Sequence, residues 1–220
     1  MKPLVIIPAY NLEPFIGSVV EGAKRFNLES LVVDDGSTDG TAQAARKAGA
    51  EVLRLSTNGG KGSALRQGFA WALHHEYNPI LTMDGDGQHD PADLPAFLKA
   101  FQDGARFVVG DRMSCPEGMP RIRRWTNRWM SCLLSLRLGK TLEDTQCGFR
   151  LMDRDLLAQI KLSSNKYEID SEILFRAAAC GVYPTPVKVR SIYGSQSSRI
   201  RPVRDTFRFL CFFAREMWTR

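Results

Sequence analysis

The chain has 220 residues, a formal net charge of +6 and 44% hydrophobic residues. This length fits one α/β domain or one domain plus a short appendage, and the absence of repeats or low-complexity tracts excludes a fibrous or disordered protein. The positive charge favours anionic partners such as phosphates, nucleic acid or an acidic membrane surface, without choosing among them.

Five cysteines without a C-x-x-C spacing fit neither a zinc site nor a disulfide framework. They predict a reducing, cytoplasmic compartment. The apolar run at the N-terminus is too short for a signal peptide. Nowhere do about 18 apolar residues follow one another, so we expect no membrane span, although the chain can still lie on a membrane surface.

The first half alternates short apolar runs with segments of helical spacing. In chain order we expect a strand Leu4–Ile7, a helix Pro14–Phe26, a strand Leu31–Val33, a helix Thr38–Gly49, a strand Glu51–Leu55, a helix Gly62–His75, a strand Pro79–Met83, a helix Pro91–Gln102 and a strand Arg106–Val109. This alternation predicts an α/β fold with a mostly parallel sheet and helices on both faces.

The second half begins with a basic and aromatic stretch, residues 119–138. After it we expect a short strand or turn near Arg150, a helix Ile169–Cys180, a strand Val182–Val189, a loop Tyr193–Arg199 and a helix Pro202–Trp218. No linker divides the chain, so the prediction is a single domain over residues 1–220.

Asp84 and Asp86 follow the strand that ends at Met83, one residue apart. Ligands of parallel sheets bind beyond the carboxyl ends of the strands, and two carboxylates there suit Mg²⁺ or Mn²⁺ bridged to a diphosphate. An isolated acidic pair of this kind equally often forms only a turn and a helix cap.

Other readings of these segments were compared by spacing. An EF-hand loop starting at Asp84 is excluded because His89 stands at the position of its glycine. A receiver domain is excluded because its acidic pair follows the first strand, whereas Asp34 and Asp35 follow the second. A haloacid-dehalogenase-like phosphatase remains a remote alternative. Residues 84–88 are close to the D-x-D-G-T motif of that family, but Gln88 stands in place of its threonine. The glycine-rich segment around Lys61 lacks the P-loop spacing, but Lys61 could still reach a phosphate.

Several segments in one order resemble family-2 glycosyltransferases with the GT-A fold, and among them the dolichol- and polyprenyl-phosphate glycosyltransferases. They are V-I-I-P-A-Y-N (residues 5–11), V-V-D-D-G-S-T-D-G-T (32–41), N-G-G-K-G-S-A-L-R-Q-G (58–68), M-D-G-D-G-Q-H-D-P (83–91), G-D-R (110–112), D-T-Q-C-G-F-R (144–150) and G-S-Q-S-S-R (194–199). The resemblance covers nearly the whole chain. It departs from the family where Leu12 separates Asn11 from Glu13.

The resemblance implies an inverting transfer of a sugar from a GDP- or UDP-sugar, with the donor bound by residues 1–112 and the acceptor by residues 113–220. The implied donor site comprises Pro8, Ala9, Tyr10, Glu13, Asp34, Asp35, Gly36, Lys61 and Asp84. Asp84, Asp86 and Gln88 would hold the divalent ion. Arg112, Arg124 and Arg199 resemble positions that face donor or acceptor phosphates.

A hydroxyl acceptor needs a general base, whereas a phosphate monoester is already a nucleophile at neutral pH and needs cations to position it. The many arginines of the second half therefore favour polyprenyl phosphate as the acceptor. Asp144 is the candidate base if the acceptor is instead a sugar or another hydroxyl; otherwise it pairs with an arginine.

The terminal helix places Arg201, Arg204, Arg208 and Arg215 on one side and aromatic residues on most of the remainder. Such a helix either lies in the headgroup region at the inner face of a membrane or packs onto the sheet. The first reading predicts a peripheral protein, with or without a membrane partner. No nucleic-acid motif is present, so we expect no nucleic-acid partner.

Overall fold

A computed structural model describes residues 1–192 and 202–218, the side chains of 202–205, 207, 217 and 218 excepted. Its seven strands form one sheet in the order β3-β2-β1-β4-β6-β5-β7. The strands are β1 (Leu4–Ala9), β2 (Glu29–Asp34), β3 (Glu51–Arg54), β4 (Ile80–Thr82), β5 (Phe107–Asp111), β6 (Arg150–Met152) and β7 (Thr185–Lys188). All strand pairs are parallel except those that β6 forms with β4 and β5. The predicted mostly parallel α/β sheet is confirmed.

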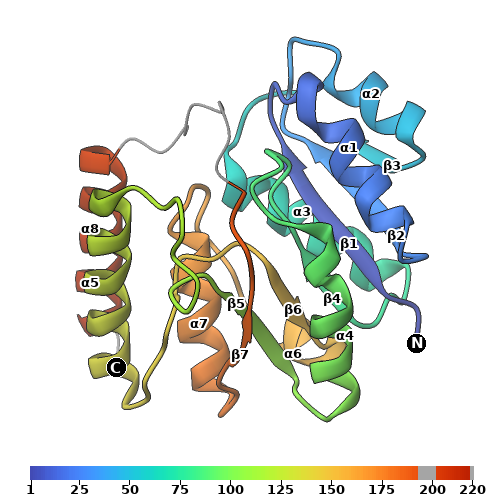
Figure 1. Cartoon of the computed structure of the whole chain (residues 1–220). Helices are drawn as coiled ribbons and strands as arrows, with labels where there is room; N and C mark the ends of the chain where they lie inside the picture. The colour runs from blue at the N-terminus through green and yellow to red at the C-terminus, as the bar shows by residue number, and fades with distance from the viewer. Residues whose placement is uncertain (193–201, 219–220) are drawn as a thin grey trace.

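Helices cover both faces of this sheet (Figure 1). They are α1 (Glu13–Lys24), α2 (Thr41–Ala48), α3 (Lys61–His74), α4 (Leu94–Gln102, preceded by a 3₁₀ turn Pro91–Asp93), α5 (Arg121–Leu138), α6 (Arg154–Gln159), α7 (Ile169–Ala179) and α8 (Pro202–Trp218). Helices α1 and α4 lie in front of the sheet in Figure 1, and α3 lies behind it. Helix α3 contacts α6 and α7, and α7 contacts α5.

The central strands are buried along their whole length because both faces are covered. All six residues of β1 and all three residues of β4 are buried. These strands therefore read as continuous apolar runs, as expected for a parallel sheet. Their carboxyl ends lead directly into the polar loops that the sequence singles out.

Strand β6 reverses the direction of the sheet between β4 and β5, which the sequence did not predict. Its first residue, Arg150, is fully buried, and its guanidinium donates to the carbonyl oxygens of Thr145, Cys147 and Asp170. These bonds satisfy the cation inside the protein and fix the loop that precedes β6. Arg150 therefore has a structural role, the binding of three backbone carbonyl groups, and is not available to bind a phosphate.

The apolar side of α8 packs inward. Phe209 and Phe212 are buried, the Phe212 ring packs edge-on against Phe175 of α7, and Glu216 forms a bidentate ion pair with Arg176. For Phe209 and Phe212 the packed alternative holds, and the interpretation that they enter the headgroup region is wrong. No helix in the described part of the chain is both long and apolar enough to cross a membrane.

The five thiols differ sharply in accessibility, which gives a test of the fold. Cys147 is buried, and burial raises the pKa of its thiol to about 12; the other four cysteines are exposed. We expect a thiol reagent such as DTNB to react promptly with four cysteines of the native protein and with the fifth only after unfolding. A fifth rapid thiol, assigned to Cys147 by peptide mapping, would contradict this packing.

Candidate active site

The loops that follow β1, β2 and β3 are bonded to one another at the carboxyl edge of the sheet. The backbone N–H of Asn11 donates to the Ser37 hydroxyl over 2.9 Å, and the Asn11 side-chain oxygen accepts the Thr38 N–H over 2.8 Å. The Asp35 carboxylate accepts the N–H groups of Gly59 and Gly60 over 2.8 and 2.7 Å. Three chain segments thus form one rigid rim.

The sequence-predicted donor residues lie along this rim. Pro8 and Ala9 end β1, and the half-buried Tyr10 follows them. Glu13 opens α1, and its carboxylate accepts the Gly40 N–H over 2.9 Å. The structure therefore brings the predicted residues of the first two loops together, with Glu13 linking one loop to the other.

Asp34 and Gly36 shape the second loop. Asp34 is fully buried; one carboxylate oxygen accepts the Ser37 N–H, and the other lies 3.4 Å from the Arg54 guanidinium. Gly36 has φ +73°, and a Cβ there would approach the backbone of Thr57 to 2.9 Å. Only glycine allows both this backbone conformation and the close approach of the two loops.

Lys61 bridges two carboxylates from distant parts of the chain. Its ammonium group lies 2.8 Å from Asp84 and 3.0 Å from Asp170. Its pKa is raised by Asp170 and Asp84 against the opposing effect of burial, and the pKa of Asp84 is lowered by Lys61. A Cβ at Gly148 would lie 2.6 Å from both Asp84 and Lys61, so this bridge requires glycine there.

Asp86 follows Asp84 by two residues in the loop after β4. Burial, and then the charge of Asp84, raise the pKa of Asp86, while its carboxylate accepts the Gln88 N–H over 3.0 Å. Two close carboxylates that repel each other in this way favour a bound cation. The side-chain oxygen of Gln88 lies 3.1 Å from Arg123, at the same loop.

The described residues contain no group of three or more His, Cys, Asp or Glu side chains arranged to hold a metal ion. A cation at Asp84 and Asp86 would therefore take its remaining ligands from Gln88, water or a diphosphate. This donor set of hard oxygens fits Mg²⁺ or Mn²⁺, both of which are usually bound by few protein ligands together with substrate phosphates.

Arg112 and Asp144 form a buried bidentate ion pair. The guanidinium donates to the two carboxylate oxygens over 2.6 and 2.9 Å, and 4% of Arg112 and 5% of Asp144 remain exposed. Against the opposing effect of burial, the Arg112 charge and the N–H of Gln146 help lower the pKa of Asp144. A carboxylate held in this way is a weak base, which bears on the choice of acceptor.

A second cluster of cations borders a hollow of about 360 Å³ next to this pair. Met113 and Ser114, which follow β5, line it together with Thr141, Leu142 and Glu143. Helix α5 contributes Arg124, Arg128, Ser131, Cys132 and Ser135. Two guanidinium groups among several hydroxyls suit a phosphate group.

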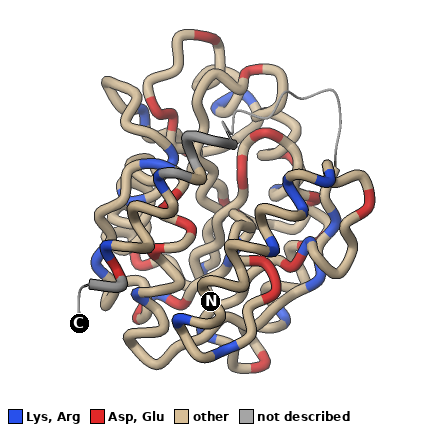
Figure 2. Tube along the Cα trace, turned by 90° about the vertical axis from the view of Figure 1, so that its left-hand side faces the viewer, with Lys and Arg blue, Asp and Glu red and all other residues tan. Residues whose placement is uncertain are grey.

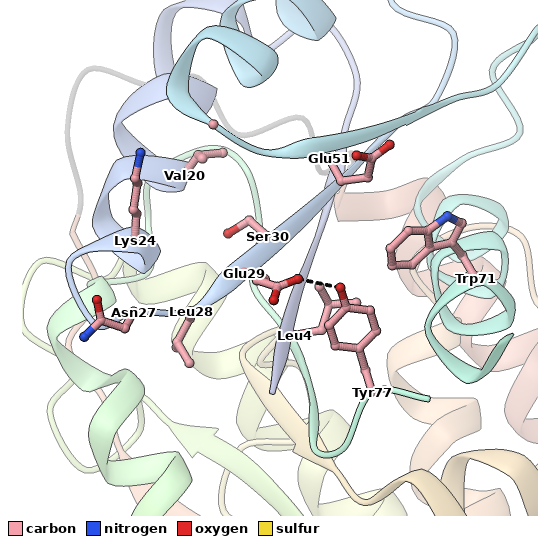
Figure 3. A pocket seen from close by; sticks show the side chains of 11 residues that line it. Leu4, Val20, Lys24, Asn27, Leu28, Glu29, Ser30, Glu51, Trp71 and Tyr77 are labelled. Atoms are coloured by element: carbon pink, nitrogen blue, oxygen red, sulfur yellow. Dashed lines mark hydrogen bonds between the residues drawn. The ribbon is translucent and has the colours of Figure 1, made fainter. Parts of the chain in front are cut away.

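Another hollow lies at the opposite edge of the sheet, where Leu4, Glu29 and Glu51 begin their strands (Figure 3). There the Tyr77 hydroxyl donates to Glu29, and burial together with that bond raises the pKa of Tyr77 to about 12. Ligands of such sheets bind at the carboxyl ends of the strands, so we do not assign the active site to this hollow.

Two contributors to the site were not predicted in these roles. Asp170 lies in the first turn of α7, more than a hundred residues after its partner Lys61, and no sequence spacing signals that contact. His89 is buried, its Nδ1 accepts the Asp84 N–H, and its ring stacks on Phe149; burial lowers its pKa to about 4. Arg199, a predicted phosphate contact, lies outside the described residues.

The model of the family "Glycosyl transferase family 2" matches residues 4–161. The chain is also 33% identical over 198 residues to the undecaprenyl-phosphate mannosyltransferase of Micrococcus luteus, covering 82% of this chain and 79% of that one. The polyprenol monophosphomannose synthase of Mycolicibacterium smegmatis is 32% identical over 197 residues, with 80% and 72% covered. The chain belongs to glycosyl transferase family 2.

Among solved structures, glucosyl-3-phosphoglycerate synthase from Mycobacterium tuberculosis has a TM-score of 0.75, with 20% identity over 96% of this chain and 78% of that one. At this identity the likeness shows the fold alone, which is GT-A. The family and its relatives make the chain an enzyme, a glycosyltransferase that resembles polyprenyl-phosphate mannosyltransferases.

Proposed function

We propose that this glycosyltransferase moves a sugar from a GDP- or UDP-sugar to a polyprenyl phosphate, with Mg²⁺ or Mn²⁺ and with inversion at the anomeric carbon. The observation that carries the choice of acceptor is the Arg112–Asp144 ion pair. In this pair the candidate base, Asp144, is already bound to Arg112. The adjoining hollow is lined by Arg124 and Arg128, which can bind an anion. The names of the M. luteus and M. smegmatis relatives support the same acceptor.

The donor half supplies binding. The rim built by Asn11, Asp35 and the glycines after β3 would hold the base and ribose of the nucleotide. Asp84, Asp86 and Gln88 would hold the divalent ion, which supplies charge neutralisation for the departing nucleoside diphosphate. Lys61 keeps Asp84 in its ionised form and adds a positive charge close to the diphosphate.

The acceptor half supplies orientation. A lipid phosphate is already ionised at neutral pH, with a second pKa near 6, so no proton has to be removed. Arg124 and Arg128 would position it so that a phosphate oxygen attacks the anomeric carbon from the face opposite the diphosphate. The C–O bond to the diphosphate breaks as the new C–O bond forms, and the leaving group retains the electron pair.

The proposal also places the protein in the cytoplasm, peripheral at the inner face of the membrane, where nucleotide sugars and the lipid phosphate meet. Incubation with radiolabelled GDP- and UDP-sugars, polyprenyl phosphate and Mn²⁺ or Mg²⁺ tests it. We expect label in the organic phase with one donor, abolished by EDTA and restored by metal. If metal-dependent release of nucleoside diphosphate occurs only with a hydroxyl acceptor, the lipid phosphate is not the acceptor and Asp144 becomes the candidate base.

The hollow at α5 gives a variant test. Arg124→Gln and Arg128→Gln should each raise the KM for polyprenyl phosphate roughly tenfold or more, because a charge-assisted hydrogen bond contributes about 1.5–3 kcal/mol. Donor affinity, measured by calorimetry, should stay within about twofold. Arg137→Gln, also exposed on α5 but outside the hollow, is the matched control. An unchanged acceptor KM in both variants would remove this hollow from the acceptor site.

A further inference from the structure

Lys61 and Asp170 form an ion pair that connects the start of α3 with the first turn of α7. The Lys61 ammonium group lies 3.0 Å from Asp170 and 2.8 Å from Asp84. In Figure 2, acidic and basic residues are interspersed along the trace, and an ion pair between exposed residues contributes little. The pair of Lys61 with Asp170 differs, because only 12% of the lysine side chain and 6% of the aspartate side chain are exposed.

Backbone contacts hold the start of α3 against the segment that precedes α7. The N–H of Ser63 donates to the carbonyl oxygen of Asn165 over 3.1 Å. A Cβ at Gly62 would lie 2.5 Å from the carbonyl oxygen of Ser164, so only glycine allows this close approach. The position of Lys61 between the two carboxylates is therefore set by the backbone on both sides of it as well as by the ion pairs.

Asp170 is held by a second cation. The guanidinium of the fully buried Arg150 donates to the Asp170 carbonyl oxygen over 2.6 Å and lies 3.7 Å from its Oδ1, whereas Oδ2 faces Lys61. Arg150 is itself fixed by two carbonyl groups of the loop before β6. The Asp170 carboxylate is thus a fixed point toward which the Lys61 ammonium group is drawn.

Lys61 and a divalent ion would share the carboxylate of Asp84. In the proposed function this carboxylate and that of Asp86 hold Mg²⁺ or Mn²⁺. An ammonium group 2.8 Å from Asp84 neutralises part of the charge that attracts the ion, and it also repels the ion directly. A second carboxylate beside the ammonium group weakens both effects. Without Asp170, Lys61 would pair with Asp84 alone.

We infer that Asp170 is a positioning residue that acts through Lys61. It draws the ammonium group away from Asp84 and so leaves the Asp84 carboxylate available to the divalent ion. The inference rests on the proposed function, in which Asp84 binds the ion that accompanies the nucleotide sugar. It goes beyond that function because it assigns control of metal affinity to a residue of α7, in the second half of the chain.

Mn²⁺ binding by the full chain without nucleotide, measured by EPR as loss of the free-ion signal, tests the inference. Asp170→Asn should weaken Mn²⁺ binding at least about fivefold, because Lys61 then pairs with Asp84 alone. Lys61→Met should strengthen it at least about fivefold, because the competing charge is gone. Lys99→Met and Asp103→Asn remove the same charges from an exposed pair, so each should stay within about twofold of the unaltered chain.

The double variant separates positioning from simple attraction. If Asp170 acts through Lys61, Asp170→Asn should change the Mn²⁺ affinity less than about twofold in the Lys61→Met background. An equal loss of affinity in both backgrounds would mean that Asp170 attracts the ion by its own charge, and would overturn the inference. Unchanged or tighter binding by Asp170→Asn alone would overturn it as well.

Folding of each variant is checked by circular dichroism and thermal melting, because breaking a buried ion pair is destabilising. Asp170→Ser and Lys61→Gln take the place of a variant that does not fold, and the same two directions of change are expected. Loss of Mn²⁺ binding in Asp86→Asn assigns the ion to this site. Binding that Asp86→Asn leaves unchanged would place the ion elsewhere and overturn the inference.

Failure of this inference is distinguishable from failure of the proposed function, because the binding assay contains neither sugar donor nor lipid. If the Mn²⁺ affinities change as expected but no lipid phosphate is labelled in the transfer assay, the role of Asp170 stands and the acceptor is refuted. Labelled lipid phosphate together with Mn²⁺ affinities that do not respond to Asp170→Asn would refute the positioning role and leave the transfer standing.

Discussion

Asp86→Asn should abolish transfer while leaving the fold intact. If Asp86 holds the divalent ion, its loss removes charge stabilisation from the departing diphosphate. Such stabilisation amounts to several kcal/mol, so we expect kcat to fall about 10³-fold. The assay is sugar transfer at saturating Mn²⁺, with Asp103→Asn, at an exposed carboxylate that pairs with Lys99, as the matched charge control.

The direction in which Asp86→Asn changes the stability of the fold also follows from the structure. Burial and the charge of Asp84 raise the pKa of Asp86 in the folded protein. Above its unfolded pKa the ionised group therefore opposes folding, and the amide removes that cost. At neutral pH and without metal, Asp86→Asn should melt at the same temperature as the unaltered chain or higher. A lower melting temperature with retained activity would contradict the assignment.

Asp144→Asn should destabilise the protein strongly. The substitution leaves the buried Arg112 guanidinium without its compensating charge, and breaking a buried pair costs about 3–5 kcal/mol. For a domain of this size that corresponds to a fall in melting temperature on the order of 10 °C. Urea unfolding and calorimetry measure both quantities. Arg112→Met/Asp144→Leu should recover much of the loss, because two apolar side chains replace the pair.

The base hypothesis predicts a different outcome for Asp144→Asn. If Asp144 were the base for a hydroxyl acceptor, the folded variant would show little turnover, and the acidic limb of the pH–rate profile would disappear. If Asp144 instead holds Arg112, the folded variant should keep transfer within about tenfold, with its pH profile unchanged. A folded but inactive variant would restore the alternative of a sugar or other hydroxyl acceptor.

The sequence was sufficient for most of the first half of the fold. Strands β1, β2 and β4 have apolar centres and each is followed by a polar segment, so their positions along the chain and the place of Asp84 after β4 followed from the pattern. The antiparallel β6 did not follow, because a strand of three residues carries no readable period. Its first residue, Arg150, is held by carbonyl oxygens of the preceding loop and of Asp170, and no local pattern signals that set of contacts.

The second half of the chain was predicted less well. The stretch 119–138 was recognised as basic and aromatic but was not assigned to a helix, and for the apolar side of α8 two alternatives, a membrane surface and the sheet, stayed open. Periodicity shows that a helix has an apolar face, but not whether protein or lipid covers it. The contact of Lys61 with Asp170 depends on how α3 and α7 pack, which no local pattern encodes.

The identity of the attacking group is the central claim, and a comparison of two acceptors tests it most directly. Polyprenyl phosphate and the polyprenol of the same length differ only in the phosphate. With the preferred donor and Mn²⁺, we predict label in the phosphate lipid alone, in a product whose mass and acid lability are those of a glycosyl phosphate. Equal or greater labelling of the free alcohol would contradict the account, because the attack would then require a base.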